Sequence, residues 1–121
     1  MSRVVHFEIA AKDVNKVKDF YSNVFGWKIE SWGGPMDYWL VSTGDDKEMG
    51  INGAIFKKEG PQTIINTIGV KNLDESIKIV EKHGGKVSSP KNAIPGVGYF
   101  AYCEDVEGNK FGMMQPDEKA K

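Results

Sequence analysis

VVHFEIAAKDVNKVKDFYSNVFGWKI occupies residues 4–29 of the chain, and IINTIGVKNLDESIKIVEKHGGKV occupies residues 64–87. Each stretch opens with β-branched residues and continues with apolar residues at three- and four-residue spacings before it reaches glycine and a further strand-like segment. Both stretches therefore predict a strand, a helix, a glycine stop and a second strand. Because an internal repeat sets the architecture of a chain, these two stretches decide the fold.

The remaining sequence continues the pattern in both halves. After the first helix we predict strands at 27–32, 38–43 and 51–58, with a break at 33–35. After the second helix we predict strands at 86–89, 99–104 and 110–115, with a proline-rich loop before residue 99. Each half is then a βαβββ module, about residues 1–60 and about 61–121, within a single domain 1–121. The fold class is α+β, with the two modules forming a half-open, mixed β-sheet barrel around a shared cleft.

Two helices with recognisable ends belong to this prediction. Asp13 can cap the first helix, and Gly26 supplies its left-handed stop. Asn72, with Glu75 three residues later, fits a capping pair for the second helix. The first helix carries apolar residues at helical spacings, namely Val14, Val17, Phe20, Tyr21, Val24 and Phe25. The buried stripe of the second helix consists of Leu73, Ile77 and Val80.

Composition excludes several classes of function. The 121 residues include 16 basic and 17 acidic side chains, which gives a net charge of −1 and no basic patch for nucleic acid or an anionic membrane. We expect no transmembrane segment and no signal peptide, because the sequence has no apolar run typical of the first and no apolar region after Met1 that resembles the second. Cys103 is the only cysteine, which favours a reducing cytoplasm and a core packing role for its thiol.

At this point the sequence resembles the vicinal-oxygen-chelate superfamily, which includes glyoxalase I, bleomycin-resistance proteins and extradiol dioxygenases. His6 within VHFEI, the FY…FGW segment at 20–27, GGKV at 84–87 and DVEGNKF at 105–111 carry the resemblance, in order and over nearly the whole chain. It implies the barrel of two βαβββ modules, a small-molecule site in the cup between them, and a homodimer. The chain is similar to small, uncharacterised single-domain members.

The resemblance also implies a metal site, with one ligand on the first strand and one on the last strand of each half. His6 matches one of these positions, whereas Asn66 stands at the second and Gly112 stands where the family brings a glutamate. The last strand of the first half offers no carboxylate or imidazole. Catalytic divalent metals need about three protein ligands, so we expect no metal cofactor. A metal enzyme would need ligands from another segment or subunit.

His6 and Glu8 are two residues apart on one strand and so point to the same side. If that side lines the cleft, they form an acid–base pair in which the carboxylate orients an imidazole that moves a proton. The alternative is that His6 is a hydrogen-bonded wall of the cleft and Glu8 lies at its rim. Their neighbours Phe7 and Ile9 should face the first helix.

Ligand-binding residues are expected among the strand aromatics and at the former metal positions. Strand alternation sends neighbouring aromatics to opposite sides, and we predict that Trp39, Phe100 and Tyr102 line the cleft. Asn66 could bind a ligand carbonyl or cap nearby backbone, and Met114 could lie on the cleft wall beside Gly112, which would leave open volume there. The acidic turns at 45–48 and 104–107 are interpreted as solvated hairpin tips.

Two main hypotheses follow for function. The first is binding of a small organic molecule in the cup, without a metal. The second is a glyoxalase-like lyase or isomerase, or a dioxygenase-related enzyme, that uses His6 with a metal or in metal-free proton transfer. A protein-interaction domain on an inherited fold is the third alternative, because fold alone does not determine function.

Overall fold

The computed structural model describes residues 2–34 and 37–121. Pro35, which belongs to the predicted break at 33–35, lies outside the described residues. Contacts divide the chain into two compact units, one formed by His6–Ile65 and the other by Asn66–Lys121 together with the first residues up to Val5. Strands β1 (Val4–Ala11) and β5 (Ile64–Gly69) therefore each contribute residues to both units.

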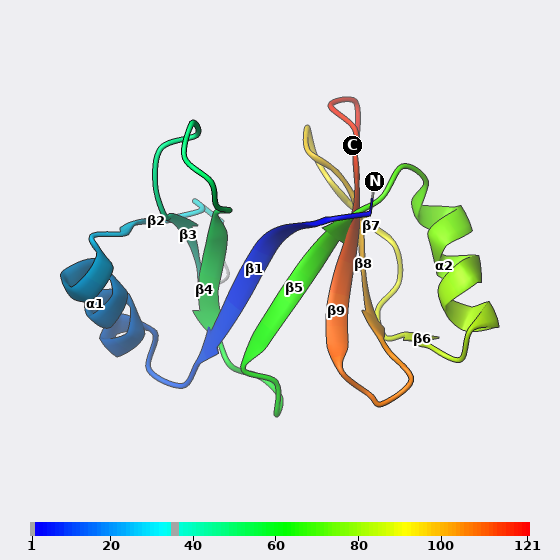
Figure 1. Ribbon diagram of the computed structural model, residues 1–121, viewed down its shortest axis with the longest axis horizontal. Coiled ribbons are helices and arrows are strands. Elements are labelled where there is room, and N and C mark those ends of the chain that lie inside the picture. Colours follow the sequence, from blue (N-terminus) through cyan, green and yellow to red (C-terminus); the bar gives the residue numbers. More distant parts are fainter. Residues whose placement is uncertain (1, 35–36) are drawn as a thin grey trace. The chain divides into compact units, whose positions relative to one another are not determined.

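The unit His6–Ile65 is a sheet with one helix (Figure 1). Its elements after β1 are α1 (Val14–Phe25), β2 (Lys28–Ser31), β3 (Tyr38–Ser42) and β4 (Gly53–Lys57). The strand order is β2-β3-β4-β1, in which β1 and β4 are parallel and the other pairs are antiparallel. Helix α1 contacts β4 and β2 and so covers one face of this sheet.

The second unit repeats this plan. After β5 come α2 (Leu73–Lys82), β6 (Lys86–Val87), β7 (Asn92–Ile94), β8 (Gly98–Glu104) and β9 (Lys110–Pro116). The strand order is β5-β9-β8-β6, with β5 and β9 parallel and the β9–β8 and β8–β6 pairs antiparallel. The predicted βαβββ repeat is therefore confirmed. Strand β7 is an addition, because the segment predicted as a proline-rich loop pairs with β8 over Asn92–Ile94.

Both helices begin at the residues that their sequences predict, and α1 also ends at the predicted glycine. The Asp13 side chain accepts a hydrogen bond from the Lys16 amide, and Gly26 ends α1 with a φ of 73°. The Asn72 side chain accepts a hydrogen bond from the Glu75 amide at the start of α2. These caps satisfy backbone groups that a helix leaves without partners.

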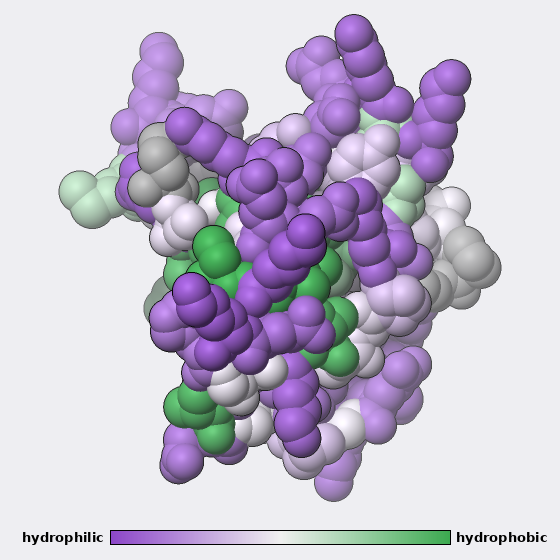
Figure 2. Space-filling model, turned by 90° about the vertical axis from the view of Figure 1, so that its right-hand side faces the viewer, coloured by the Kyte–Doolittle hydropathy of each residue, from purple (hydrophilic) through white to green (hydrophobic). Residues whose placement is uncertain are grey.

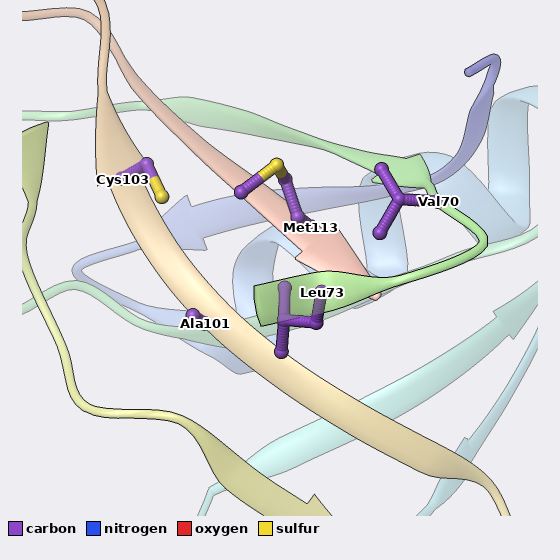
Figure 3. Close-up of a cluster of buried hydrophobic side chains, with 5 residues drawn as sticks. All are labelled: Val70, Leu73, Ala101, Cys103 and Met113. Carbon is purple, nitrogen blue, oxygen red and sulfur yellow. The ribbon is translucent and has the colours of Figure 1, made fainter. Parts of the chain in front are cut away.

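Each unit has its own hydrophobic core beneath its helix. In the unit of α1 the buried members are Ala11, Val14, Val41 and Ile55. In the unit of α2 they are Val70, Leu73, Ala101, Cys103 and Met113, whose side chains gather over β8 and β9 in Figure 3. Burial and the nearby Glu81 raise the pKa of the Cys103 thiol, which fits the predicted packing role.

The two helices differ in how fully their apolar residues are buried. On α2, Leu73 is buried and Ile77 and Val80 pack against the core, as predicted. Its outer side is mainly hydrophilic (Figure 2), although Ile79 remains exposed. On α1 the predicted stripe is only partly buried, because Phe20, Val24 and Phe25 are more than half exposed. Neither helix in the described part of the chain is long and apolar enough to cross a membrane.

Candidate functional site

The first strand carries polar residues on one face and core residues on the other. Phe7 and Ile9 pack against the hydrophobic cluster beneath α1, as predicted. Strand alternation then places His6 and Glu8 together on the opposite face. Glu8 is only 4% exposed and His6 is half-buried. A buried carboxylate is costly unless hydrogen bonds stabilise it, so its partners define this site.

Tyr38 joins these two residues. Its hydroxyl group donates a hydrogen bond to Glu8 Oε2 at 2.7 Å. The oxygen of that Tyr38 hydroxyl group also lies 3.2 Å from His6 Nε2. Tyr38 is not among the site residues predicted from the sequence. We call the group of His6, Tyr38 and Glu8 the polar triad.

The register explains how a residue of β3 reaches a residue of β1 across the intervening β4. Tyr38 pairs with Phe56 on β4, while Glu8 pairs with Ala54 on the same strand. The ring of Tyr38 must therefore extend over β4 beside Ala54, which has no side-chain atom beyond Cβ. A small residue at position 54 leaves room for this crossing.

Aromatic rings surround the polar triad. The ring of Trp32 meets that of Tyr38 edge-on, with centroids 6.0 Å apart and an interplanar angle of 72°. The ring of Phe56 lies 6.3 Å from that of Tyr38 at 40°. Trp32 is 43% exposed. The triad thus combines hydrogen-bonding groups with apolar surface, which is the usual composition of a small-molecule site.

The environment of His6 favours its neutral form. Burial lowers the pKa of the imidazole, and the carboxylate of Glu8 opposes this effect without cancelling it. A neutral imidazole keeps one ring nitrogen as a hydrogen-bond acceptor and can take up a proton.

The prediction that Trp39 shares a face with His6 is wrong by one residue. Trp39 pairs with Ile55 and packs against the core on the helix-covered face. Its indole N–H donates to Asp37 at 2.6 Å, and the Lys18 ammonium lies 3.3 Å from its ring centroid. Because side chains alternate along a strand, Tyr38 rather than Trp39 faces the polar triad.

The same one-residue shift applies to Asn66. Asn66 pairs with Phe111 and shares its side of β5 with Ile68, and both of these residues pack in the core beneath α2. Thr67 therefore occupies the face that Asn66 was expected to occupy. It is 1% exposed, and among the residues the structure describes its hydroxyl oxygen has no hydrogen-bond partner.

Phe100, Tyr102 and Met114 lie on the side of their sheet away from α2, because Ala101, Cys103 and Met113 alternate with them and form the core. Phe100 and Tyr102 meet edge-on at 4.7 Å, and Phe100 pairs with Met114. Ligand binding by any of them stays a prediction.

The expected open volume beside Gly112 is filled by Phe100. A Cβ atom built on Gly112 would lie 2.6 Å from Phe100 Cζ and 3.1 Å from Thr67 Oγ1. A longer side chain at position 112 could not project here unless the ring moved.

The described residues do not fit the metal of the resembled family. No group of three or more His, Cys, Asp or Glu side chains gathers as ligands among them. His6 Nε2 is already engaged by Tyr38, and the Phe100 ring fills the space next to Gly112. We therefore derive no chemistry through a metal ion.

A separate hollow of about 150 Å³ lies in the connection between β3 and β4. It is lined by Thr43, Gly44, Asp45, Asp46, Glu48, Met49, Gly50 and Asn52. Nearly all of these residues are exposed, which agrees with the interpretation of this acidic turn as a solvated hairpin tip. The hollow contains no residue of the polar triad.

Comparison with known proteins identifies the family. The model of the Glyoxalase/Bleomycin resistance protein/Dioxygenase superfamily matches residues 3–113. A glyoxylase-like domain-containing protein of Didymella fabae is 32% identical over 112 residues, which cover 84% of this chain and 84% of that protein. The chain belongs to the Glyoxalase/Bleomycin resistance protein/Dioxygenase superfamily.

Solved structures show the same fold. A superfamily member from Vibrio splendidus 12B01 matches with a TM-score of 0.68 and 14% identity, covering 97% of this chain and 100% of that chain. A methylmalonyl-CoA epimerase in complex with methylmalonyl-CoA and NH4+ matches with a TM-score of 0.69 and 13% identity, covering 100% and 99%. The predicted α+β fold of this superfamily is confirmed.

Proposed function

We propose that this protein binds a small organic molecule at the polar triad without a metal ion. The observation that carries the proposal is the partly buried chain of hydrogen bonds from Glu8 through Tyr38 to His6, bordered by the rings of Trp32 and Phe56. Such a surface orients a ligand by hydrogen bonds and holds it by apolar contact. The epimerase among the structural neighbours, whose structure contains methylmalonyl-CoA, supports the use of this fold for organic ligands.

The proposal is tested on the full chain after treatment with a chelator. A library of small aromatic and aliphatic fragments is screened by two-dimensional NMR, and we expect shifts centred on His6, Trp32 and Tyr38. Tyr38→Phe should weaken those hits, whereas the matched variant Tyr99→Phe should leave them unchanged. Tight stoichiometric binding of Zn²⁺ or Ni²⁺ through His6, with fragments bound only in its presence, would contradict the metal-free proposal.

A second candidate is metal-free proton transfer by a lyase or isomerase, with His6 as the base. The lowered pKa of His6 favours it, because a neutral imidazole can accept a proton near neutral pH. The test follows exchange of the acidic C–H protons of 2-tetralone in D₂O. We expect His6→Gln to slow any protein-catalysed exchange by about 100-fold or more. Exchange that the substitution leaves unchanged would remove His6 from this role.

We also propose that the protein works in the cytoplasm and forms a homodimer. The single cysteine supports a reducing compartment. The three exposed apolar residues of α1, Phe20, Val24 and Phe25, offer surface that a second copy could cover. Sedimentation of the full chain at several concentrations tests the dimer.

A further inference from the structure

The polar triad fixes which nitrogen of His6 carries its proton. A carboxylate only accepts hydrogen bonds, and a phenol has a single proton to donate. Since the Tyr38 hydroxyl lies 2.7 Å from Glu8 Oε2, its proton is directed to Glu8. The Tyr38 oxygen can then act only as an acceptor towards His6 Nε2, 3.2 Å away. Nε2 of His6 is therefore the protonated nitrogen.

This assignment leaves Nδ1 of His6 as an acceptor. Neutral imidazole has one N–H, so the second ring nitrogen presents a lone pair. Among the residues that the structure describes, Nδ1 of His6 makes no hydrogen bond. Burial of the ring lowers its pKa and so supports the neutral form.

The charged residues on this face of the sheet lie at different distances from His6. Glu8 is two residues from His6 on the same strand. Glu30 pairs with Leu40 and shares this face with Lys28, and both of these charged residues are exposed on β2. Three strand spacings separate β2 from β1, roughly 14 Å. That distance exceeds the Debye length of about 8 Å at physiological salt, so Glu8 dominates the field at His6.

We propose that the polar triad selects uncharged ligands that donate an O–H or N–H hydrogen bond to Nδ1 of His6, and that it discriminates against carboxylates and phosphates. This inference rests on the proposed function, since it specifies the ligand class of the same site. A donor satisfies the open lone pair, whereas an anion would be repelled by the Glu8 carboxylate. The rings of Trp32 and Phe56 favour ligands with a planar apolar body.

Three probes of one shape separate these contributions. 2-Naphthol is uncharged near neutral pH and donates a hydrogen bond, 2-methoxynaphthalene lacks the donor, and 2-naphthoate is an anion. Each is titrated into the full chain while the ring resonances of His6 are followed by NMR. We expect 2-naphthol to bind at least about tenfold more tightly than either of the other probes. His83 is the internal control, and its resonances should not move.

The outcomes distinguish the inference from the proposed function. If 2-naphthoate or 2-methoxynaphthalene shifts His6 with the same Kd as 2-naphthol, the ligand class is wrong while binding at the triad stands. If none of the probes moves the His6 resonances, the result counts against both proposals.

The isosteric variant Glu8→Gln gives an independent test of the charge. Glutamine keeps an acceptor for the Tyr38 hydroxyl but removes the negative charge. We expect the ratio of the Kd for 2-naphthoate to that for 2-naphthol to fall at least about tenfold. A ratio that stays constant would show that the carboxylate does not select against anions.

Discussion

The two units of the molecule follow the same strand plan but differ in the chemistry of equivalent positions. In the unit His6–Ile65, Tyr38 reaches Glu8 and forms a hydrogen bond. In the unit of α2, the register places Phe100 where Tyr38 stands and Thr67 where Glu8 stands. Phe100 has no hydroxyl group, and the buried Thr67 hydroxyl has no partner among the described residues. The pair of positions is thus joined by a hydrogen bond in one unit, whereas in the other an apolar ring stands beside an unbonded hydroxyl group among the described residues.

In both units the residue beneath the aromatic ring of Tyr38 or Phe100 is small. Ala54 pairs with Glu8, and Gly112 pairs with Thr67. Each is the small residue over which an aromatic side chain extends. Both units thus place a small residue beneath an aromatic ring, but the ring of Tyr38 carries a hydroxyl group that reaches a carboxylate, whereas the ring of Phe100 carries no hydroxyl group.

The largest expected effect comes from removing the hydroxyl group that joins the polar triad. Tyr38→Phe deletes a charge-assisted hydrogen bond to a buried carboxylate, so we expect the free energy of unfolding to fall by about 1.5–3 kcal/mol. Chemical denaturation measures this loss. The matched control is Tyr99→Phe, because the Tyr99 hydroxyl makes no hydrogen bond in the described part of the chain. Equal losses in both variants would contradict the special role of Tyr38.

A slightly smaller loss in the free energy of unfolding is expected when the space that the Phe100 ring occupies over Gly112 is filled. Gly112→Ala places a Cβ atom 2.6 Å from the Phe100 ring, so the ring must move. Overpacking of this kind should lower the free energy of unfolding by about 2 kcal/mol. Gly44→Ala is the control, since its added atom would make only an ordinary contact with Glu48 at 3.5 Å. A neutral Gly112→Ala would show that Phe100 does not need the space.

A gain in stability is expected from Thr67→Val. The substitution keeps the branched shape and removes a buried hydroxyl without a partner, so we expect the free energy of unfolding to rise by about 1 kcal/mol. Phe100→Tyr should supply the missing partner, as Tyr38 does in the other unit. A double-mutant cycle between positions 67 and 100 measures their coupling. If Phe100→Tyr has the same effect with threonine and with valine at position 67, the predicted hydrogen bond does not form.

The smallest effect concerns the dependence of stability on pH. Since the pKa of folded His6 lies below its ordinary value of 6.5, the unfolded chain binds more protons there. The contribution of His6 should be fully present above about pH 6.5 and should be lost as pH falls towards the lower, folded pKa. Glu8→Gln removes the negative charge that raises the pKa of His6, so an NMR titration should show this pKa falling further. A rise in that variant would contradict the assigned role of Glu8.

The fold was predictable because its signals are local. Asp13 and Gly26 mark the ends of α1, and the second stretch repeats the order of strand, helix and glycine. His6 and Glu8 could be placed on one face because alternation along a single strand is enough to relate them.

The rest of the site depends on register, which local sequence does not specify. The predictions for Trp39 and Asn66 were each wrong by one residue. Because side chains alternate along a strand, each of these two residues lies on the opposite face from the one predicted, and Tyr38 and Thr67 lie on the predicted face. The partner strand fixes that choice through pairs such as Trp39 with Ile55. Alignment of the two repeats is the signal that identifies Tyr38 as a site residue, since Tyr38 and Phe100 are the aromatic residues at equivalent positions of β3 and β8.

The tautomers of the two histidines test the central claim most directly. The chain contains only His6 and His83. His83 Nδ1 lies 3.0 Å from the Ile79 carbonyl oxygen, which can only accept, so its proton belongs on Nδ1. The polar triad places the proton of His6 on Nε2. Nitrogen-15 NMR of the ring nitrogens, at a mildly alkaline pH, should therefore show Nε2–H for His6 and Nδ1–H for His83. A proton on Nδ1 of His6 would contradict the account.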